Sequence, residues 1–367
     1  MKIVRRSNQN FVTSEFLPYS KLIEPVVINL LKNQHFGLCL CIRENLLNEE
    51  LDRLCRLYTK AGIPLIFWPL LPEQEGLYLN KYSITEYYQY LDTVFDWLES
   101  RGHHIFGLLV DVEPDYQKPK PGSSPIIDNI WNSIRDMDEA DFKEAITGFR
   151  QIIAKIRKHG CQAIGAALPF VCNDKLEHSE VWQDYWGGPV AMVEWDVLVF
   201  MLFGSWFVQM GLSWPNAHYL IYDYTEAIRK FWPNKAVVAL GVTTPGTGAE
   251  KDLYQSPAQL SEGVSAVKAA GISNIAIYDL KGILDSPNPA AWLKKVQVAK
   301  PLIPGTDKKS SVDYSRPIID PFQVRVYKTI VRLLGKLLET VRFMKNTGKR
   351  FLPYWVTGET NRSNPHV

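Results

Sequence analysis

The stretch GLLVDVEPD, residues 107–115, decides how the rest of the sequence is interpreted. Its first four residues are small or apolar, which is typical of a strand buried on both faces of a sheet. Two acids, Asp111 and Glu113, follow at alternate positions, and a proline closes the run. Because strand side chains alternate between faces, both carboxylates are expected on one face, about 6–7 Å apart at their Cα atoms. The stretch therefore predicts a buried strand that ends in two neighbouring acids.

Six further apolar segments resemble this strand, and helical patterns separate most of them. Strands of this kind joined by helices indicate a parallel sheet covered on both faces. A further strand is expected within residues 2–12, followed by a helix over about residues 19–32. Eight β/α units in about 300 residues predict a (β/α)8 TIM barrel. The other seven strands are expected at residues 36–42, 63–70, 105–112, 161–168, 195–203, 236–242 and 275–280.

A doubly wound open sheet is the alternative architecture. Such sheets bind nucleotides through glycine-rich turns, and neither G-x-G-x-x-G nor G-x-x-x-x-G-K-[ST] follows any of these strands. The barrel is therefore the favoured fold.

The C-terminal part of the chain has a different pattern. The barrel is expected over residues 1–300, a linker over 301–319, a basic amphipathic helix over 320–347 and a polar tail over 348–367. One helical face carries Arg325, Lys328, Arg332, Lys336 and Glu339. The opposite face carries Val326, Ile330, Leu333, Leu334, Leu337, Val341 and Met344. Such a helix either packs its apolar face on the barrel or touches an anionic membrane or an acidic partner through residues 322–345.

Composition excludes several classes of protein. The net charge of the 367-residue chain is +2, so nucleic acid is not an expected partner. The chain has five cysteines without metal-ligand spacing, which indicates buried, reduced thiols. The seven histidines are scattered, so we expect neither a metal ion nor a cofactor. We find neither a secretory signal nor a long apolar span, which favours a cytoplasmic protein, with peripheral membrane contact as an option.

The chemistry is expected where the strand emerges, because TIM-barrel active sites form at the carboxyl ends of the strands. Asp111 and Glu113 would share a partly desolvated pocket there. One carboxyl group would then stay protonated and act as a general acid, while the other stays ionised. The alternative is a purely structural role, in which the two acids form ion pairs with Arg43 or Lys281. Trp68 and Tyr278 are candidates for stacking on a flat ligand such as a sugar ring.

Residues 106–113, FGLLVDVE, resemble the DGxDxDxE motif of the family 18 glycoside hydrolases, the chitinases and their relatives. Gly107, Asp111 and Glu113 match the motif. Phe106 and Leu109 stand where the family has aspartates.

Later strands extend this resemblance. Residues 236–246, AVVALGVTTPG, are similar to the family's seventh strand, and residues 276–280, AIYDL, to the eighth. Tyr278 takes the place of the aromatic residue that forms the floor of a sugar subsite. The sixth strand keeps Met201 of the family's M-x-Y-D pattern, but Phe203 and Gly204 replace its polar groups.

The resemblance implies a glycan hydrolase in which Glu113 protonates the leaving oxygen. Asp111 would orient and stabilise a 2-acetamido group that attacks the anomeric carbon. Because Phe203 and Leu109 depart from the pattern, another glycoside with a second acid from elsewhere fits equally well. Candidates for that acid are Glu73, Glu75, Asp174 and Asp279.

The substrate-binding residues are expected to be Trp68, Tyr278, Asp279 and Glu73. Two other functions stay open. One is an inactive barrel that binds a glycan or a protein, and the other is a barrel enzyme that uses Mg²⁺ at the acidic strand ends.

Overall fold

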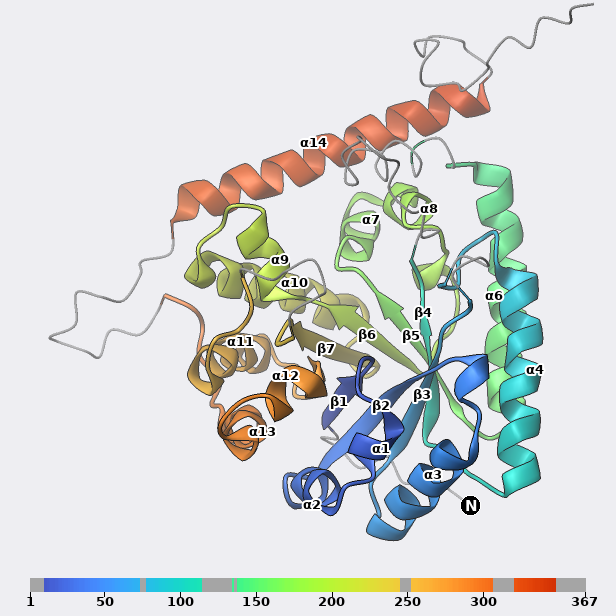
Figure 1. Cartoon of the computed structure of the whole chain (residues 1–367). Helices are drawn as coiled ribbons and strands as arrows, with labels where there is room; N and C mark the ends of the chain where they lie inside the picture. Colours follow the sequence, from blue (N-terminus) through green and yellow to red (C-terminus); the bar gives the residue numbers. More distant parts are fainter. Residues whose placement is uncertain are drawn as a thin grey trace, which may run out of the picture.

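The computed structural model describes residues 10–72, 77–113, 134, 137–244, 252–305 and 320–347. Within these residues, parallel strands close into a barrel in chain order, from β1 round to β8 (Figure 1). The predicted TIM barrel is therefore confirmed, and the open sheet is excluded. The strands are β1 (Asn10–Ser14), β2 (Phe36–Ile42), β3 (Leu65–Pro69), β4 (Gly107–Asp111), β5 (Gln162–Ala167), β6 (Val197–Met201), β7 (Ala236–Gly241) and β8 (Ile275–Tyr278).

Seven strands lie within the apolar runs that predicted them, and most are one or two residues shorter at an end. The exception is β1, which was expected within residues 2–12 and instead spans Asn10–Ser14. Its residues are all buried or half-buried, as fits a strand that pairs with both β2 and β8. This shift matters because it places Glu15 at the carboxyl end of a barrel strand.

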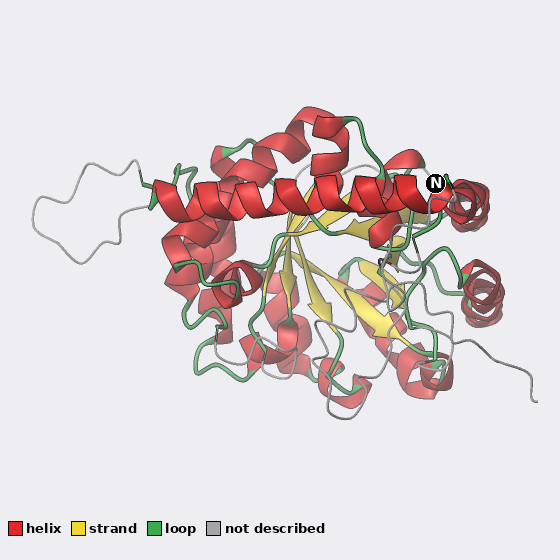
Figure 2. Ribbon diagram, turned by 90° about the horizontal axis from the view of Figure 1, so that it is seen from above, coloured by secondary structure: helices red, strands yellow, loops and turns green. Residues whose placement is uncertain are grey.

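Helices surround the barrel (Figures 1 and 2). The N-terminus of α3 is capped by Asn48, which accepts hydrogen bonds from the backbone N–H groups of Glu50 and Leu51. Gly62 ends the same helix at a φ of 71°, a conformation that favours glycine. The helices before the linker are α1 (Tyr19–Leu22), α2 (Pro25–Asn33), α3 (Glu49–Ala61), α4 (Ile84–Arg101), α6 (Glu139–Lys158), α7 (Val171–Glu177), α8 (Val181–Tyr185), α9 (Gly204–Gln209), α10 (Trp214–Phe231), α11 (Pro257–Ala269), α12 (Leu280–Leu284) and α13 (Pro289–Val298).

Strand side chains alternate between two apolar clusters. On β4, Leu108 and Val110 pack in the outer core between strands and helices, whereas Leu109 packs in the barrel interior. The period of two then directs Asp111 and Glu113 to the interior at its carboxyl mouth. Below them the interior is apolar, and it contains Phe11, Cys39, Cys41, Ile66, Trp68, Leu109, Ile164, Ala166, Val199, Met201, Ala239 and Ala276.

The C-terminal helix α14 (Pro321–Asn346) lies across the barrel and packs against α8 and α10 (Figures 1 and 2). The face that it packs differs in part from the expected one, because Val326, Ile330, Leu333 and Leu337 are exposed, whereas Leu334 and Val341 of the expected face pack inward. These two belong to a repeat with spacings of three and four residues that we did not recognise in the sequence. Its members are Val324, Tyr327, Val331, Leu334, Leu338 and Val341.

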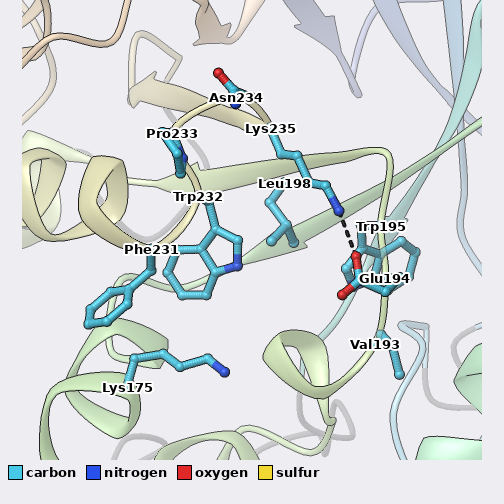
Figure 3. A pocket seen from close by; sticks show the side chains of 10 residues that line it. All are labelled: Lys175, Val193, Glu194, Trp195, Leu198, Phe231, Trp232, Pro233, Asn234 and Lys235. Carbon is cyan, nitrogen blue, oxygen red and sulfur yellow. Dashed lines mark hydrogen bonds and ion pairs between the residues drawn. The ribbon is translucent and has the colours of Figure 1, made fainter.

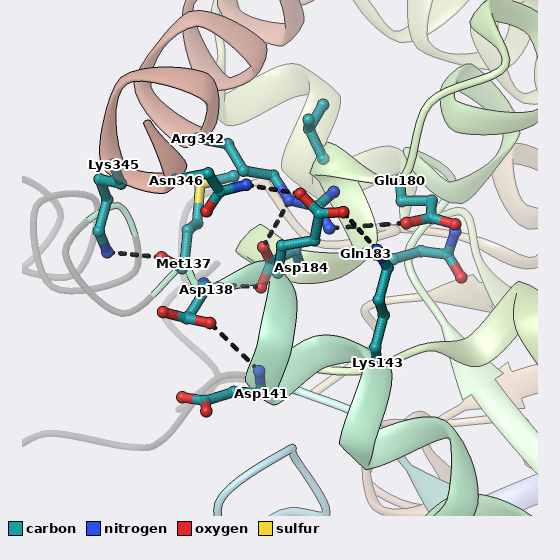
Figure 4. Close-up of polar contacts among 12 residues, drawn as sticks. Met137, Asp138, Asp141, Lys143, Glu180, Gln183, Asp184, Arg342, Lys345 and Asn346 are labelled. Atoms are coloured by element: carbon teal, nitrogen blue, oxygen red, sulfur yellow. Dashed lines mark hydrogen bonds and ion pairs between the residues drawn. The ribbon is translucent and has the colours of Figure 1, made fainter. Parts of the chain in front are cut away.

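Polar contacts fix both ends of α14. Near its start, the Asn216 side chain donates to Gln323 at 2.6 Å and accepts from the backbone N–H of Asp320 at 2.9 Å. Near its end, Arg342 lies 3.2 Å from Asp184 of α8, and Lys345 donates to the backbone carbonyl of Met137 (Figure 4). The helix is thus attached to loops on the carboxyl side of the barrel.

Candidate active site

Three carboxyl groups converge at the mouth of the barrel. Asp111 ends β4, Glu113 lies two residues further on, and Glu15 directly follows β1. Their proximity is seen in their electrostatics, because Glu15 raises the pKa of both Asp111 and Glu113. Sequence reasoning did not identify Glu15. The available signal was the alternation Phe11, Thr13, Glu15, in which an acid follows a β-type run as it does in β4.

The three groups titrate differently because their surroundings differ. Asp111 is buried, and both this burial and the charges of Glu113 and Glu15 hold its pKa well above its usual range. Burial and the charge of Glu15 raise the pKa of the half-buried Glu113 from 4.5 to about 7. Burial also raises the pKa of Glu15, but a hydrogen bond and a nearby cation oppose the rise.

The groups that oppose it are Tyr278 and Arg43. The Tyr278 hydroxyl donates to Oε2 of Glu15 at 2.5 Å, and the Arg43 guanidinium lowers the pKa of the same carboxyl. Of the three acids, Glu15 therefore has the surroundings best suited to an anion. An arrangement that separates the pKa values of neighbouring carboxyls is what acid–base catalysis requires.

The structural ion-pair alternative for Asp111 and Glu113 lacks its predicted partners. Lys281 pairs instead with Asp285 at 2.7 Å, and Arg43 acts on Glu15 and Cys41. Within the described part of the chain, Oδ1 of Asp111 has no hydrogen-bond partner. Two acids held close together in this way carry an energetic cost, which favours a functional role over a structural one.

Aromatic side chains surround the acids. Tyr278 stacks on Phe203 with ring centroids 5.4 Å apart, and Phe203 meets Trp206 edge-on at 4.6 Å. Several half-buried rings pack against the interior cluster in this way and expose part of their surface, as sugar-binding rings do. They are Tyr78, Phe170, Trp186, Trp206 and Tyr278, whereas Phe106 packs against the same cluster at the amino end of β4. Trp68, which was predicted to bind substrate, is instead buried in the interior cluster.

Of the four predicted candidates for a second acid, two have structural hydrogen-bond partners and two lie outside the described residues. Asp279 is fully buried, accepts a hydrogen bond from Thr244 and caps α12 through the Gly282 N–H. Asp174 accepts from the backbone N–H groups of Trp182 and Gln183 at 3.1 and 3.0 Å, so it orders the start of α8. Both therefore have structural partners. Glu73 and Glu75 lie outside the described residues.

We also searched the described residues for other places that could bind a metal ion or a ligand. In the described ranges, no group of three or more His, Cys, Asp or Glu side chains is arranged to hold a metal ion. A pocket of about 360 Å³ is formed mainly by the residues that precede β6 and β7, so it lies toward the amino ends of these strands (Figure 3). Lys235 and Glu194 pair there at 2.6 Å. The pocket is thus at the opposite end of these strands from the acids.

No family model and no curated protein sequence matches the chain. Among solved structures, the PgaB (BpsB) glycoside hydrolase domain from Bordetella bronchiseptica is similar, with 10% identity and a TM-score of 0.48 over 79% of this chain and 99% of that one. A GH5_18 protein from Streptomyces cattleya in complex with Manb1-4GlcNAc has 12% identity and a TM-score of 0.49 over 91% and 92%. A D-psicose 3-epimerase has 11% identity and a TM-score of 0.44 over 90% and 99%. Likenesses of this size assign no activity.

The raised pKa of Glu113 predicts a pH-dependent cost to stability. Below about pH 4.5 the carboxyl is protonated in both the folded and the unfolded chain, so folding carries no penalty. As the pH rises toward 7, only the unfolded chain ionises freely, and the folded state loses stability. We expect Glu113→Gln to raise the free energy of unfolding by about 2–3 kcal/mol at pH 8 and to change it little at pH 4. Urea unfolding at both values measures this, and equal effects at the two values would contradict it.

Proposed function

We propose that the protein hydrolyses glycosidic bonds at the carboxyl mouth of its barrel. The observation that carries the proposal is the convergence of Glu15, Asp111 and Glu113 above an apolar interior and among half-buried aromatic rings. Glycosidases need one protonated and one ionised carboxyl group on either side of the scissile bond. Burial and the charge of Glu15 raise the pKa of Glu113 to about 7, which favours the first state. Burial raises the pKa of Glu15 too, but Tyr278 and Arg43 oppose that rise, so Glu15 is the better candidate for the second.

Each acid then has a distinct role. Glu113 donates its proton to the glycosidic oxygen as the bond to the anomeric carbon breaks. The Glu15 carboxylate, held by Tyr278, stabilises the positive charge that develops at that carbon or attacks it directly. Water then bonds to the anomeric carbon, and Glu113, now ionised, takes a proton from that water and is restored as the acid. Asp111 lies beside Glu113, and burial together with the charges of Glu113 and Glu15 holds its pKa well above its usual range, which favours its protonated form next to the acid.

This assignment differs from the one that the family 18 resemblance implied for the second group. Leu109 and Phe203 are both apolar members of the interior cluster. The acetamido-assisted mechanism would need polar groups at these two positions. Glu15 instead supplies a carboxylate of the protein in the role that the substrate's acetamido group has in that mechanism. The proposal therefore does not require an N-acetylated sugar as substrate.

The test is hydrolysis of a panel of glycans and aryl glycosides by the whole chain, with and without a chelator. We expect turnover that chelation leaves unchanged, because the proposed groups need no metal ion. Glu15→Gln should lower kcat by about 10²-fold or more, because it removes the ionised partner. Turnover abolished by chelator would instead favour Mg²⁺ chemistry.

The inactive barrel is the competing function, and Phe106, Leu109 and Phe203 are the residues that favour it. It predicts glycan binding without turnover across the panel. Binding that Tyr278→Ala weakens, together with no detectable hydrolysis, would replace our proposal with this one.

A further inference from the structure

Helix α14 has three faces, of which only one packs on the barrel. A second face carries large apolar side chains that lie in solvent along almost its whole length. Their exposed fractions are 69% for Phe322, 38% for Val326, 59% for Ile330, 64% for Leu333 and 52% for Leu337. The spacings of four, four, three and four residues keep these side chains in one straight row. We call this row the apolar stripe.

A row of cations lies beside the apolar stripe. Arg325, Lys328, Arg332 and Lys336 follow one another at spacings of three, four and four residues, and all are exposed. The row also contacts acids of this chain, since Lys328 pairs with Asp223 and Lys336 with Glu339. We call these four residues the basic row. An exposed apolar row flanked by cations is the pattern of helices that lie in the interface of an anionic bilayer.

We propose that α14 attaches the protein to anionic lipid surfaces, with the apolar stripe in the acyl boundary and the basic row against the phosphate headgroups. The inference is independent of the proposed hydrolytic function. Within the described ranges, no helix combines the length and the apolar character needed to cross a membrane. The contact would therefore lie in the plane of the surface.

Charge complementarity favours lipid over a second copy of the chain. If two copies paired through the apolar stripe, the basic row of each would lie at the edge of the shared interface. Flanking positions of paired helices normally match acids with bases, and only Glu339 is available here against four cations. A bilayer with anionic headgroups satisfies the basic row and the apolar stripe together.

The packing of α14 sets the orientation of the attached protein. The helix is held by α8 and α10 and by the loop at Met137, all of which follow carboxyl ends of strands. The lipid surface would then lie beside the rim that carries the three acids (Figure 2). The active site would thus work close to the membrane.

The test is co-sedimentation of the full chain with vesicles of phosphatidylcholine alone and vesicles that also contain phosphatidylserine. We expect binding to the anionic vesicles only, weakened at high salt. Ile330→Gln, Leu333→Gln and Leu337→Gln combined should reduce the partition coefficient about tenfold or more. Arg325→Gln with Arg332→Gln should reduce it by a similar factor.

The matched controls change equally exposed residues in or directly after other helices. Val26→Gln, Met210→Gln and Val298→Gln, which replace side chains exposed by 53–66%, control for the apolar variant. Arg53→Gln with Lys60→Gln on α3 controls for the cation variant. We expect both controls to bind as the unchanged chain does.

Three outcomes would overturn the proposal. The first is equal binding by the stripe variant and its control, and the second is no binding of the unchanged chain to anionic vesicles. The third is a dimer in light scattering that the stripe variant abolishes, which would assign the apolar stripe to a second copy. We also expect the stripe variant to unfold at the temperature of its control, because its side chains face solvent; a lower temperature would mean that the chain itself covers them.

Discussion

We expect Glu113→Gln to lower kcat/KM on unactivated glycans by about 10²- to 10⁴-fold, because it removes the proton that the departing oxygen needs. The amide is close in shape to the protonated carboxyl, so the surrounding contacts survive. KM should change little, since the proton transfer takes place in the transition state and not in the bound ground state.

The leaving group provides the decisive comparison. A dinitrophenyl glycoside departs as a stable anion and needs little protonation, so Glu113→Gln should retain much more of its activity on this substrate. Equal losses on the glycan and the dinitrophenyl glycoside would contradict the role of Glu113 as the acid. Glu50→Gln, which changes an exposed carboxyl on α3, is the matched control and should leave both rates unchanged.

The pH profile offers an independent check on the same group. The activity that depends on protonated Glu113 should fall as the pH rises through about 7. Glu113→Gln should remove this alkaline limb from whatever activity it retains on the dinitrophenyl glycoside.

The barrel could be predicted from the sequence because a strand that is buried on both faces is visible as a continuous apolar run. Segments such as residues 36–42, FGLCLCI, are buried throughout, and a continuous apolar run is what a strand between barrel interior and outer helices produces. The prediction failed at β1, where Thr13 and Ser14 interrupt the apolar run. The neighbours β2 and β8 fix that strand, and these contacts are not visible locally.

Only the part of the site that lies on a single strand could be predicted from the sequence. Asp111 and Glu113 share β4, so a period of two was enough to place them on one face. Glu15 joins them from about 100 residues earlier in the chain, through closure of the barrel. Asp279 and Asp174 show a second limit, because both accept backbone N–H groups at helix starts, and the sequence does not separate an acid that caps a helix from one that lines a site.

A second large effect is expected outside the three proposed acids, in the ion pair between Lys81 and Asp184. Their charged atoms lie 2.6 Å apart, and the two side chains are 1% and 0% exposed. Arg342 of α14 approaches the other oxygen of Asp184 at 3.2 Å (Figure 4). The pair therefore joins the C-terminal helix to the loop after β3. The same loop contains Leu79, whose N–H donates a hydrogen bond to the backbone carbonyl of Asp111.

Asp184→Ala should lower the free energy of unfolding by about 3–5 kcal/mol, because it removes the carboxylate that lies 2.6 Å from the buried Lys81 ammonium. Urea unfolding at neutral pH measures the loss. Lys143→Ala, which removes an exposed ion pair with Glu139 on α6, is the control and should cost less than about 1 kcal/mol.

The double change Lys81→Met with Asp184→Leu separates the cost of an unpaired charge from the value of the pair. Two apolar side chains of similar size need no desolvation, so the double variant should recover most of the stability that Asp184→Ala loses. Arg342 keeps an acid within reach in this variant, since Glu180 lies 3.5 Å away. If the double variant were as unstable as Asp184→Ala, the network would be needed for the shape of the loop after β3 and not only for charge balance.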